Sequence, residues 1–371
     1  MTGRRAVALA APLVSLACAW CTRPAPNHAT AIAPRDAAVV DAPAATSATD
    51  AALADAALAD AQPEADADPP DDPMALHSDT TDQLLALFSL EQFEPAKYAK
   101  VRPDLFLSRN VGVGVASRMN QGNKAIAHHA VGKRACLAGL AGVVLQTPEQ
   151  KAACKGQPNM VPVWGKGGSL ESPRFCIDVF EFPNKPCELP FVWTAPTFAQ
   201  TMCQLQGKRL CAQEEWNLAC RGDPAGGADR TYAYGDELDL DVCNTHKSPP
   251  DRRKCDARTL EGAWSTCGTH TEPSGAFPKC RSRFGVFDQH GNVAEVMTRK
   301  ERDGNVVTQL KGSAFFYVEV ARRPEDPAWS PGAHGETYPD HCNYDPRWHV
   351  EPIEKAWHVN YHLGFRCCLS P

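Results

Sequence analysis

The sequence lacks three features that would assign it to a common functional class. Its N-terminal apolar run, residues 6–17, is too short to cross a bilayer as a helix. Acidic residues outnumber basic ones by 44 to 38, and no basic stripe interleaved with aromatic residues occurs, so we expect no nucleic-acid partner. No C-x2-C pair follows residue 21, which argues against the commonest zinc-binding arrangement.

The N-terminus has the pattern of an export signal. Arg4 and Arg5 precede the apolar run, and small residues lead up to Cys18. The stretch 15–18 looks like the box at which bacterial lipoproteins are cut and lipid-modified. We therefore predict a signal peptide over residues 1–18, lipidation at Cys18, and an exported protein tethered at the cell envelope by lipid. A plain signal peptide cut a few residues later is the alternative.

Cysteine, by contrast, is abundant. Of the sixteen cysteines, fourteen lie between residues 136 and 368. An even number of cysteines in an exported chain is typical of a disulfide framework, here with up to seven bonds. The sequence does not fix the pairing, but Cys136 and Cys154 bracket a short helical stretch and are the favoured pair.

Residues 19–81 differ in composition from the rest of the chain. They are dominated by Ala, Asp and Pro and contain the echo AALADAALADA. Because residues 22–82 hold twelve acidic and two basic residues, the net charge of −6 belongs to this segment, and the rest of the chain is close to neutral. We expect a disordered linker, since it has too few apolar residues to offset the entropy of ordering.

The segment after the linker is predicted to be helical. Apolar residues over 82–93 are spaced as in a short amphipathic helix, and residues 112–155 are expected to be mostly helix. Thr147 precedes one of these helices at the position of a cap. We therefore predict a helical N-terminal extension over residues 82–158.

Residues 159–371 are predicted to form a single α+β domain. Short extended pieces, separated by glycine and proline, begin at Met160 and Arg174. A helix over 194–207 has Thr194 as its expected cap, and a second helix covers 214–222. Small helices packed on short, disulfide-linked strands favour this class over a parallel sheet or a bundle.

Five blocks in this region resemble, in order, those of the formylglycine-generating enzyme family, also called the sulfatase-modifying-factor domain. The first is GKRLCAQEEWNLACRG, residues 207–222. The other four are YAYG at 232–235, FGVFDQHGNVAEV at 284–296, LKGSAF at 310–315 and GFRC at 364–367. The resemblance implies a C-type-lectin-like fold with little regular secondary structure. It also implies scaffold roles for Arg209, Glu215, Trp216, Arg221, Gly291 and Arg366.

The same resemblance raises the question of catalysis. Oxidases of this family hold copper(I) with two cysteines, five residues apart, that follow the glycine-serine strand. Thiolates select Cu(I) because both are soft. Residues 313–323 contain no cysteine here, and no C-x4-C occurs in the chain, so we expect no copper site. Cys342 is then the remaining candidate for a catalytic thiol.

Histidine offers two further metal candidates. Iron-dependent sulfoxide synthases related to this family need a histidine triad on an N-terminal helical domain, for which His128 and His129 are the only candidates, and the spacing of that triad is missing. The C-terminal part is richer in histidine, and a cluster with Cys342 would be able to bind a metal. Its members are His341, His349, His358 and His362.

Calcium is the cofactor that the resemblance supports best. Family calcium ligands carry over as two sets, and oxygen ligands of both kinds suit Ca²⁺. The first set is Asn244, Thr245 and Phe277, with the family's acidic ligand replaced by Gly275. The second set is Asn292, Val293 and Glu295.

Two classes of function follow. The first is a lipid-anchored, non-catalytic binding or scaffold module, whose loops bind an exported protein, a peptide or a glycan. The alternative is an enzyme, either a formylglycine-generating oxidase or another metal-dependent modifier of exported proteins. The missing copper pair favours the first.

The first block also predicts a particular disulfide. In the family, a proline and a threonine stand where this chain has Cys211 and Ala212. Loss of the threonine cap should cost about 1 kcal/mol, although Glu215 remains to complete half of a capping box. We expect Cys211 to be disulfide-bonded and to fix this junction, with Cys203, Cys220 or the pair 367–368 as partner.

Overall fold

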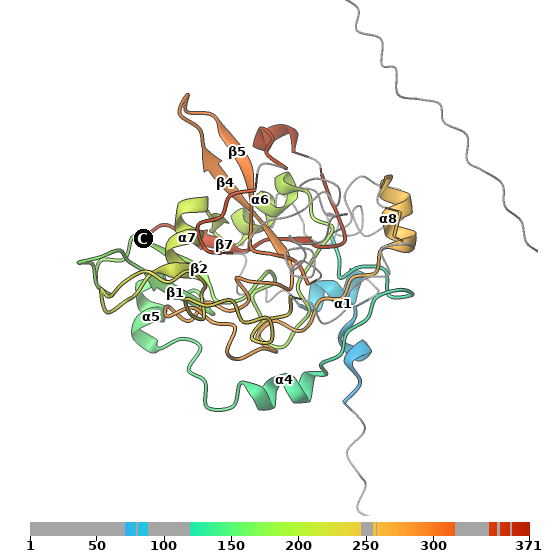
Figure 1. The fold of residues 1–371 in the computed structure, drawn as a ribbon, viewed down its shortest axis with the longest axis horizontal. Helices are drawn as coiled ribbons and strands as arrows, with labels where there is room; N and C mark the ends of the chain where they lie inside the picture. The colour runs from blue at the N-terminus through green and yellow to red at the C-terminus, as the bar shows by residue number, and fades with distance from the viewer. Residues whose placement is uncertain are drawn as a thin grey trace, which may run out of the picture. The chain divides into compact units, whose positions relative to one another are not determined.

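The computed structural model shows a mixed helical and sheet fold (Figure 1), as predicted. It describes residues 71–78, 81–87, 119–245, 255–256, 258–315, 341–346, 349–356 and 358–371. All of them belong to one unit, Ala67–Pro371. The predicted signal peptide, Cys18 and the linker up to residue 70 lie outside the described residues. Within the described residues, no helix has the length and apolar character needed to cross a membrane.

The main sheet holds the last strand of the chain between two earlier strands. Its strands are β1 (Met160–Val163), β2 (Phe175–Asp178), β3 (Arg209–Leu210) and β7 (Cys367–Leu369). Their order is β1-β2-β7-β3, with every pair antiparallel. Every residue of β1, β2 and β7 is buried, so this sheet is enclosed by the rest of the fold.

A second sheet is built on a long hairpin. It contains β4 (Ala294–Lys300), β5 (Val306–Lys311) and β6 (Leu363–Gly364), in the order β5-β4-β6. Figure 1 shows the tip of the β4–β5 hairpin extending beyond the other elements. Burial follows this shape, because the start of β4 is buried and its end is exposed.

The helices are short. Those of the N-terminal part are η1 (Pro73–Leu76), α1 (Thr81–Ala86), α4 (Lys133–Gly139) and α5 (Pro148–Ala153). The later ones are α6 (Pro196–Leu205), α7 (Gln213–Arg221), α8 (Leu260–Thr266) and η3 (Ile353–Lys355). Thr147 caps α5 in a reciprocal pair with Gln150, which confirms the predicted cap.

Two local predictions were wrong. Ala195 rather than Thr194 precedes α6, and the Thr194 hydroxyl donates to the carbonyl of Val192 instead. Residues 119–132 are not helical, because this stretch satisfies its backbone through distant partners. The amide of Asn120, for example, donates to Val192, and the amide of Ala130 donates to the carboxylate of Glu272. The spacing of apolar residues does not predict hydrogen bonds between segments that are far apart in the sequence.

The end of the predicted linker is part of the fold. The carboxylate of Asp71 accepts the amides of Arg134 (3.0 Å) and Ala135 (2.7 Å) at the start of α4. Gly132, the N-cap residue of α4, has no side chain for this task, so Asp71 supplies the missing acceptor from more than 60 residues away. These amide hydrogen bonds lower the pKa of Asp71.

Seven disulfides link the fourteen cysteines of the folded part. The favoured pairing of Cys136 with Cys154 was wrong. The first bonds Cys187, in the loop after β2, and the second bonds Cys176 on β2. The other pairs are Cys203–Cys367, Cys211–Cys368, Cys220–Cys342, Cys243–Cys280 and Cys255–Cys267. So dense a framework indicates an oxidising compartment.

Candidate functional site

The block that carries the resemblance is held by a disulfide and an ion pair. Cys211 bonds Cys368 on β7, which confirms the prediction that this cysteine is bonded. Ala212 provides no side-chain cap to α7, but the carboxylate of Glu215 accepts the Ala212 amide at 2.8 Å. The same carboxylate binds both terminal nitrogens of Arg209. The junction therefore keeps half of the capping box and gains a covalent link.

Arg366 organises the polar centre of the domain. Its side chain is fully buried and donates to both oxygens of Glu295 and to the carbonyl of Phe287. Trp216 also donates its indole N–H to Glu295, at 3.0 Å. Burial raises the pKa of Glu295, whereas Arg366 and Trp216 oppose that rise by stabilising the charged carboxylate. These contacts join α7, β4 and the residue directly before β7, so they support the fold.

Two more carboxylates are buried near Arg366. Burial, together with the charges of Asp288 and Glu295, raises the pKa of Glu181 well above its usual value. Burial likewise raises the pKa of Asp288 to about 7. A single guanidinium cannot neutralise three carboxylates, so the protonated form of an acid is favoured here. Sequence reasoning missed both residues.

The second calcium set does not form a cation site. The side-chain oxygen of Asn292 accepts from Asn244 (3.0 Å) and from the amide of Glu272 (2.8 Å). The carboxylate of Glu295 is occupied by Arg366 and Trp216, as described above. The Val293 amide donates to Glu181. Since the side-chain oxygens meant for calcium already accept protein donors, the residues present do not fit a Ca²⁺ ion.

The first calcium set fits better. The Cys243–Cys280 disulfide ties the loop of Asn244 and Thr245 to the turn that contains Phe277. Asn244 is 1 % exposed, and its side-chain oxygen has no hydrogen-bond partner. A buried oxygen without a donor is the chemistry that a hard cation would satisfy. The carbonyl of Phe277, however, already accepts the amide of Cys280.

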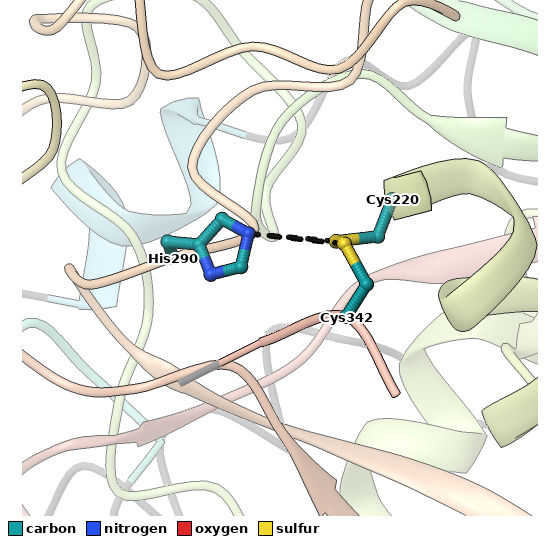
Figure 2. A group of neighbouring side chains, drawn as sticks. All are labelled: Cys220, His290 and Cys342. Atoms are coloured by element: carbon teal, nitrogen blue, oxygen red, sulfur yellow. Dashed lines mark hydrogen bonds between the residues drawn. A yellow bond between two sulfur atoms is a disulfide. The ribbon is translucent and has the colours of Figure 1, made fainter. Parts of the chain in front are cut away.

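In the described part of the chain, a disulfide and a histidine bring three metal-ligand types together (Figure 2). Cys220, at the end of α7, bonds Cys342, and Nε2 of His290 lies 3.5 Å from Sγ of Cys220 and 4.0 Å from Sγ of Cys342. All three residues are buried. Cys342 is thus not a free thiol in this structure, and its predicted catalytic role needs correction.

The other histidines are spread over the fold. His349 and His358 stack at 4.1 Å, His341 packs on Tyr344, and His362 packs on Tyr361. Among the described residues, these histidines and Cys342 do not form a group with ligand atoms close enough to share a metal ion. In the N-terminal part of the fold, Nε2 of His129 lies 3.0 Å from Nδ1 of His77. Burial lowers the pKa of His129 to about 4.

A shallow groove of about 950 Å³ lies beside the second block of the resemblance. Tyr234 lines it, followed by the loop 235–242 with four acidic residues. Lys279 and Arg281 also line it. It therefore offers an aromatic ring and charges of both signs to solvent.

The family assignment rests on the region that contains these contacts. Residues 182–369 match the model of the sulfatase-modifying factor enzyme 1-like domain, which is more than half of the chain. The chain belongs to this family. No curated protein matches it.

Two solved structures are similar to this sulfatase-modifying factor domain protein. "Crystal Structure of CarF" is 14% identical, with a TM-score of 0.33, over 53% of this chain and 86% of that one. "Major Tropism Determinant P3c Variant" is 13% identical, with a TM-score of 0.26, over 57% of this chain and 52% of that one. The chain therefore spans about half the length of the second structure.

For this sulfatase-modifying factor domain protein, the copper chemistry of the family has no matching ligands. Residues 313–323 contain no cysteine, and every cysteine from 136 to 368 is in a disulfide. Copper(I) needs thiolates, and a disulfide sulfur carries no proton to lose. Sequence reasoning also missed His290, although its place directly before Gly291 in the third block was a usable signal.

Proposed function

We propose that this protein is an exported, lipid-anchored binding module that has kept the scaffold of its family and lost the family's oxidase activity. The observation that carries this proposal is the absence of a thiolate pair. The sequence has no cysteine where the family's pair is expected, and the fourteen cysteines of the folded part are joined in seven disulfides.

Export and anchoring are supported by the N-terminus and by the disulfides. Seven disulfides form and persist in an oxidising compartment outside the cytosol. The basic pair Arg4–Arg5, the apolar run and Cys18 supply a route there and an attachment point. The acidic linker then sets the domain away from the membrane surface.

The groove beside Tyr234 is the surface that we propose for binding an exported protein, peptide or glycan. A tyrosine ring contributes a large contact area at low entropic cost, and flanking charges of both signs give orientation. The Cys243–Cys280 disulfide links two segments of the groove lining, because its cysteines directly follow Val242 and Lys279. Such a crosslink would preorganise the site.

Two measurements test this function. The purified full chain, loaded with Cu(I) and supplied with oxygen and a cysteine-containing substrate peptide of family oxidases, should produce no formylglycine. Turnover above a metal-free control would overturn the non-catalytic role.

For binding, peptides and glycans from the envelope should be screened on the immobilised full chain. Tyr234→Ala should weaken any captured ligand by about tenfold or more, the range expected for an aromatic anchor. Val306→Ala, on the β5 strand outside the groove lining, is the matched control and should leave affinity unchanged. Equal binding by both variants would exclude this groove.

A further inference from the structure

Cys220, Cys342 and His290 have the geometry of a metal site in which the two sulfur ligands are bonded to each other as a disulfide. Three separate segments contribute to it, namely the end of α7, the turn after residue 341 and the loop before β4 (Figure 2). Among the described residues, it is the one trio of cysteine, histidine or carboxylate side chains whose ligand atoms all lie within 4.8 Å.

The distances match what a small cation requires. Metal–sulfur bonds of about 2.3 Å and metal–nitrogen bonds of about 2.0 Å, at angles between tetrahedral and trigonal, place N and S about 3.5–3.7 Å apart. Nε2 of His290 lies 3.5 Å from one sulfur and 4.0 Å from the other. The histidine is thus already in place, and only the two sulfurs would have to separate.

The histidine also has the right protonation. Nε2 of His290 accepts the backbone N–H of Ala233 at 2.9 Å, so this nitrogen carries a lone pair and not a proton. An imidazole nitrogen that carries a lone pair is the form that binds a metal. The cation would replace the Ala233 hydrogen bond.

Two tyrosine rings pack against His290. The rings of Tyr232 and Tyr234 lie 5.6 and 5.4 Å from the ring of His290, and both tyrosines are partly exposed, whereas His290 is buried. This turn therefore lies between the buried histidine and solvent.

We propose that reduction of the Cys220–Cys342 disulfide creates a three-ligand site for a d¹⁰ cation of the Cu(I) and Zn(II) class. A dithiol reductant supplies two electrons and two protons, so that it becomes a disulfide and the two cysteines become thiols. Binding of the cation then releases the two thiol protons, and two thiolates and one imidazole hold the metal. In the oxidised protein, the disulfide leaves no thiolate to bind the cation.

This site uses none of the residues of the missing family pair, and it meets the binding groove at Tyr234, which lines the groove and packs on His290. Failure of metal binding in the wild type would leave the proposed binding function untouched, because that function is tested by ligand capture without reduction. The metal site adds to the binding module a response to the redox state of the compartment.

Metal-protection alkylation tests the proposal on the full chain. The native protein is treated with a dithiol, freed of it without oxygen, and alkylated with or without one equivalent of Zn(II) or Cu(I). Peptide mass spectrometry then reports each cysteine. We expect either metal to slow alkylation of Cys220 and Cys342 by about tenfold or more, while other opened cysteines react unchanged. Equal rates with and without metal would overturn the proposal.

The histidine is tested by a variant with a matched control. His290→Gln should lose the protection by about tenfold or more, while Cys220 and Cys342 remain reducible. His270→Gln, which removes a half-buried imidazole elsewhere in the fold, should keep it. Protection that survives in His290→Gln would contradict the site.

If the His290 variant fails to fold, X-ray absorption of the metal-loaded wild type decides the question. It should show two sulfur ligands and one nitrogen ligand at about 2.3 and 2.0 Å. A shell made of sulfur alone or oxygen alone would refute the proposal.

Discussion

Two disulfides end on adjacent residues of β7, and this makes their contributions to stability depend on each other. Cys203 bonds Cys367, and Cys211 bonds Cys368. When one bond is present, the other closes a ring of only about eleven residues. The chain entropy that this second bond removes from the unfolded state should stabilise the fold by about 2.7 kcal/mol. When both are absent, the first bond closes a path of about 37 residues through the disulfide at the end of α7, which gives about 3.8 kcal/mol.

The prediction is a non-additive loss. Cys211→Ala with Cys368→Ala should lower the free energy of unfolding by about 2.7 kcal/mol, and Cys203→Ala with Cys367→Ala by about the same amount. The variant that lacks both bonds should lose about 6.5 kcal/mol, roughly 1 kcal/mol more than the sum of the two.

The assay is guanidinium unfolding followed by tryptophan fluorescence, with every protein checked for complete oxidation of its remaining cysteines. Removal of Cys255–Cys267, whose cysteines are 12 residues apart, is the control and should add to either loss. Strict additivity of the two β7 bonds, or a loss near 5 kcal/mol for one of them alone, would refute the entropic account of this junction.

Three further predictions follow from the buried polar groups. Glu295→Gln should lower the free energy of unfolding by about 3–5 kcal/mol in thermal or denaturant unfolding, because it leaves the charge of Arg366 buried without its main partner; wild-type stability would contradict this. Burial lowers the pKa of His270 to about 4 in the folded protein, below the value of about 6.5 expected in the unfolded chain. As the pH falls from 6.5 to 4, the unfolded state therefore binds a proton that the folded state does not, and the free energy of unfolding should decrease by up to about 3 kcal/mol. His270→Gln should flatten that slope, and an unchanged pH profile would rule the histidine out. Millimolar Ca²⁺ should raise the melting temperature of the wild type, and Asn244→Ala should remove the increase; a calcium effect that survives in the variant would place the ion elsewhere.

The sequence predicted those features of the structure that depend on residues close to one another in the chain. The first block predicted α7, the loss of its cap and the bonded state of Cys211, because a helix start and its substitutions are visible within ten residues. The strands at Met160 and Phe175 were also predicted, since glycine and proline mark their ends. The class of fold followed from these pieces.

The rest depends on contacts between distant segments. Topology sets the pairing of the cysteines, the cap that Asp71 gives to α4 and the grouping of His290 with Cys220. The spacing of apolar residues along the chain carries no information about such contacts. The same holds for the second calcium set. Its residue types suit the ion, but the sequence does not show that Arg366, 71 residues beyond Glu295, donates to the carboxylate that the ion would need.

The central claim is that the native protein holds no thiolate pair, and a map of free thiols tests it most directly. The full chain, isolated without reductant, is alkylated under denaturing conditions and digested, and the fourteen cysteines from 136 to 368 are read by mass spectrometry. We predict that all fourteen are unlabelled and that the seven linked peptides correspond to the pairs described. Two labelled cysteines in the native protein, together with one bound Cu(I), would contradict the account.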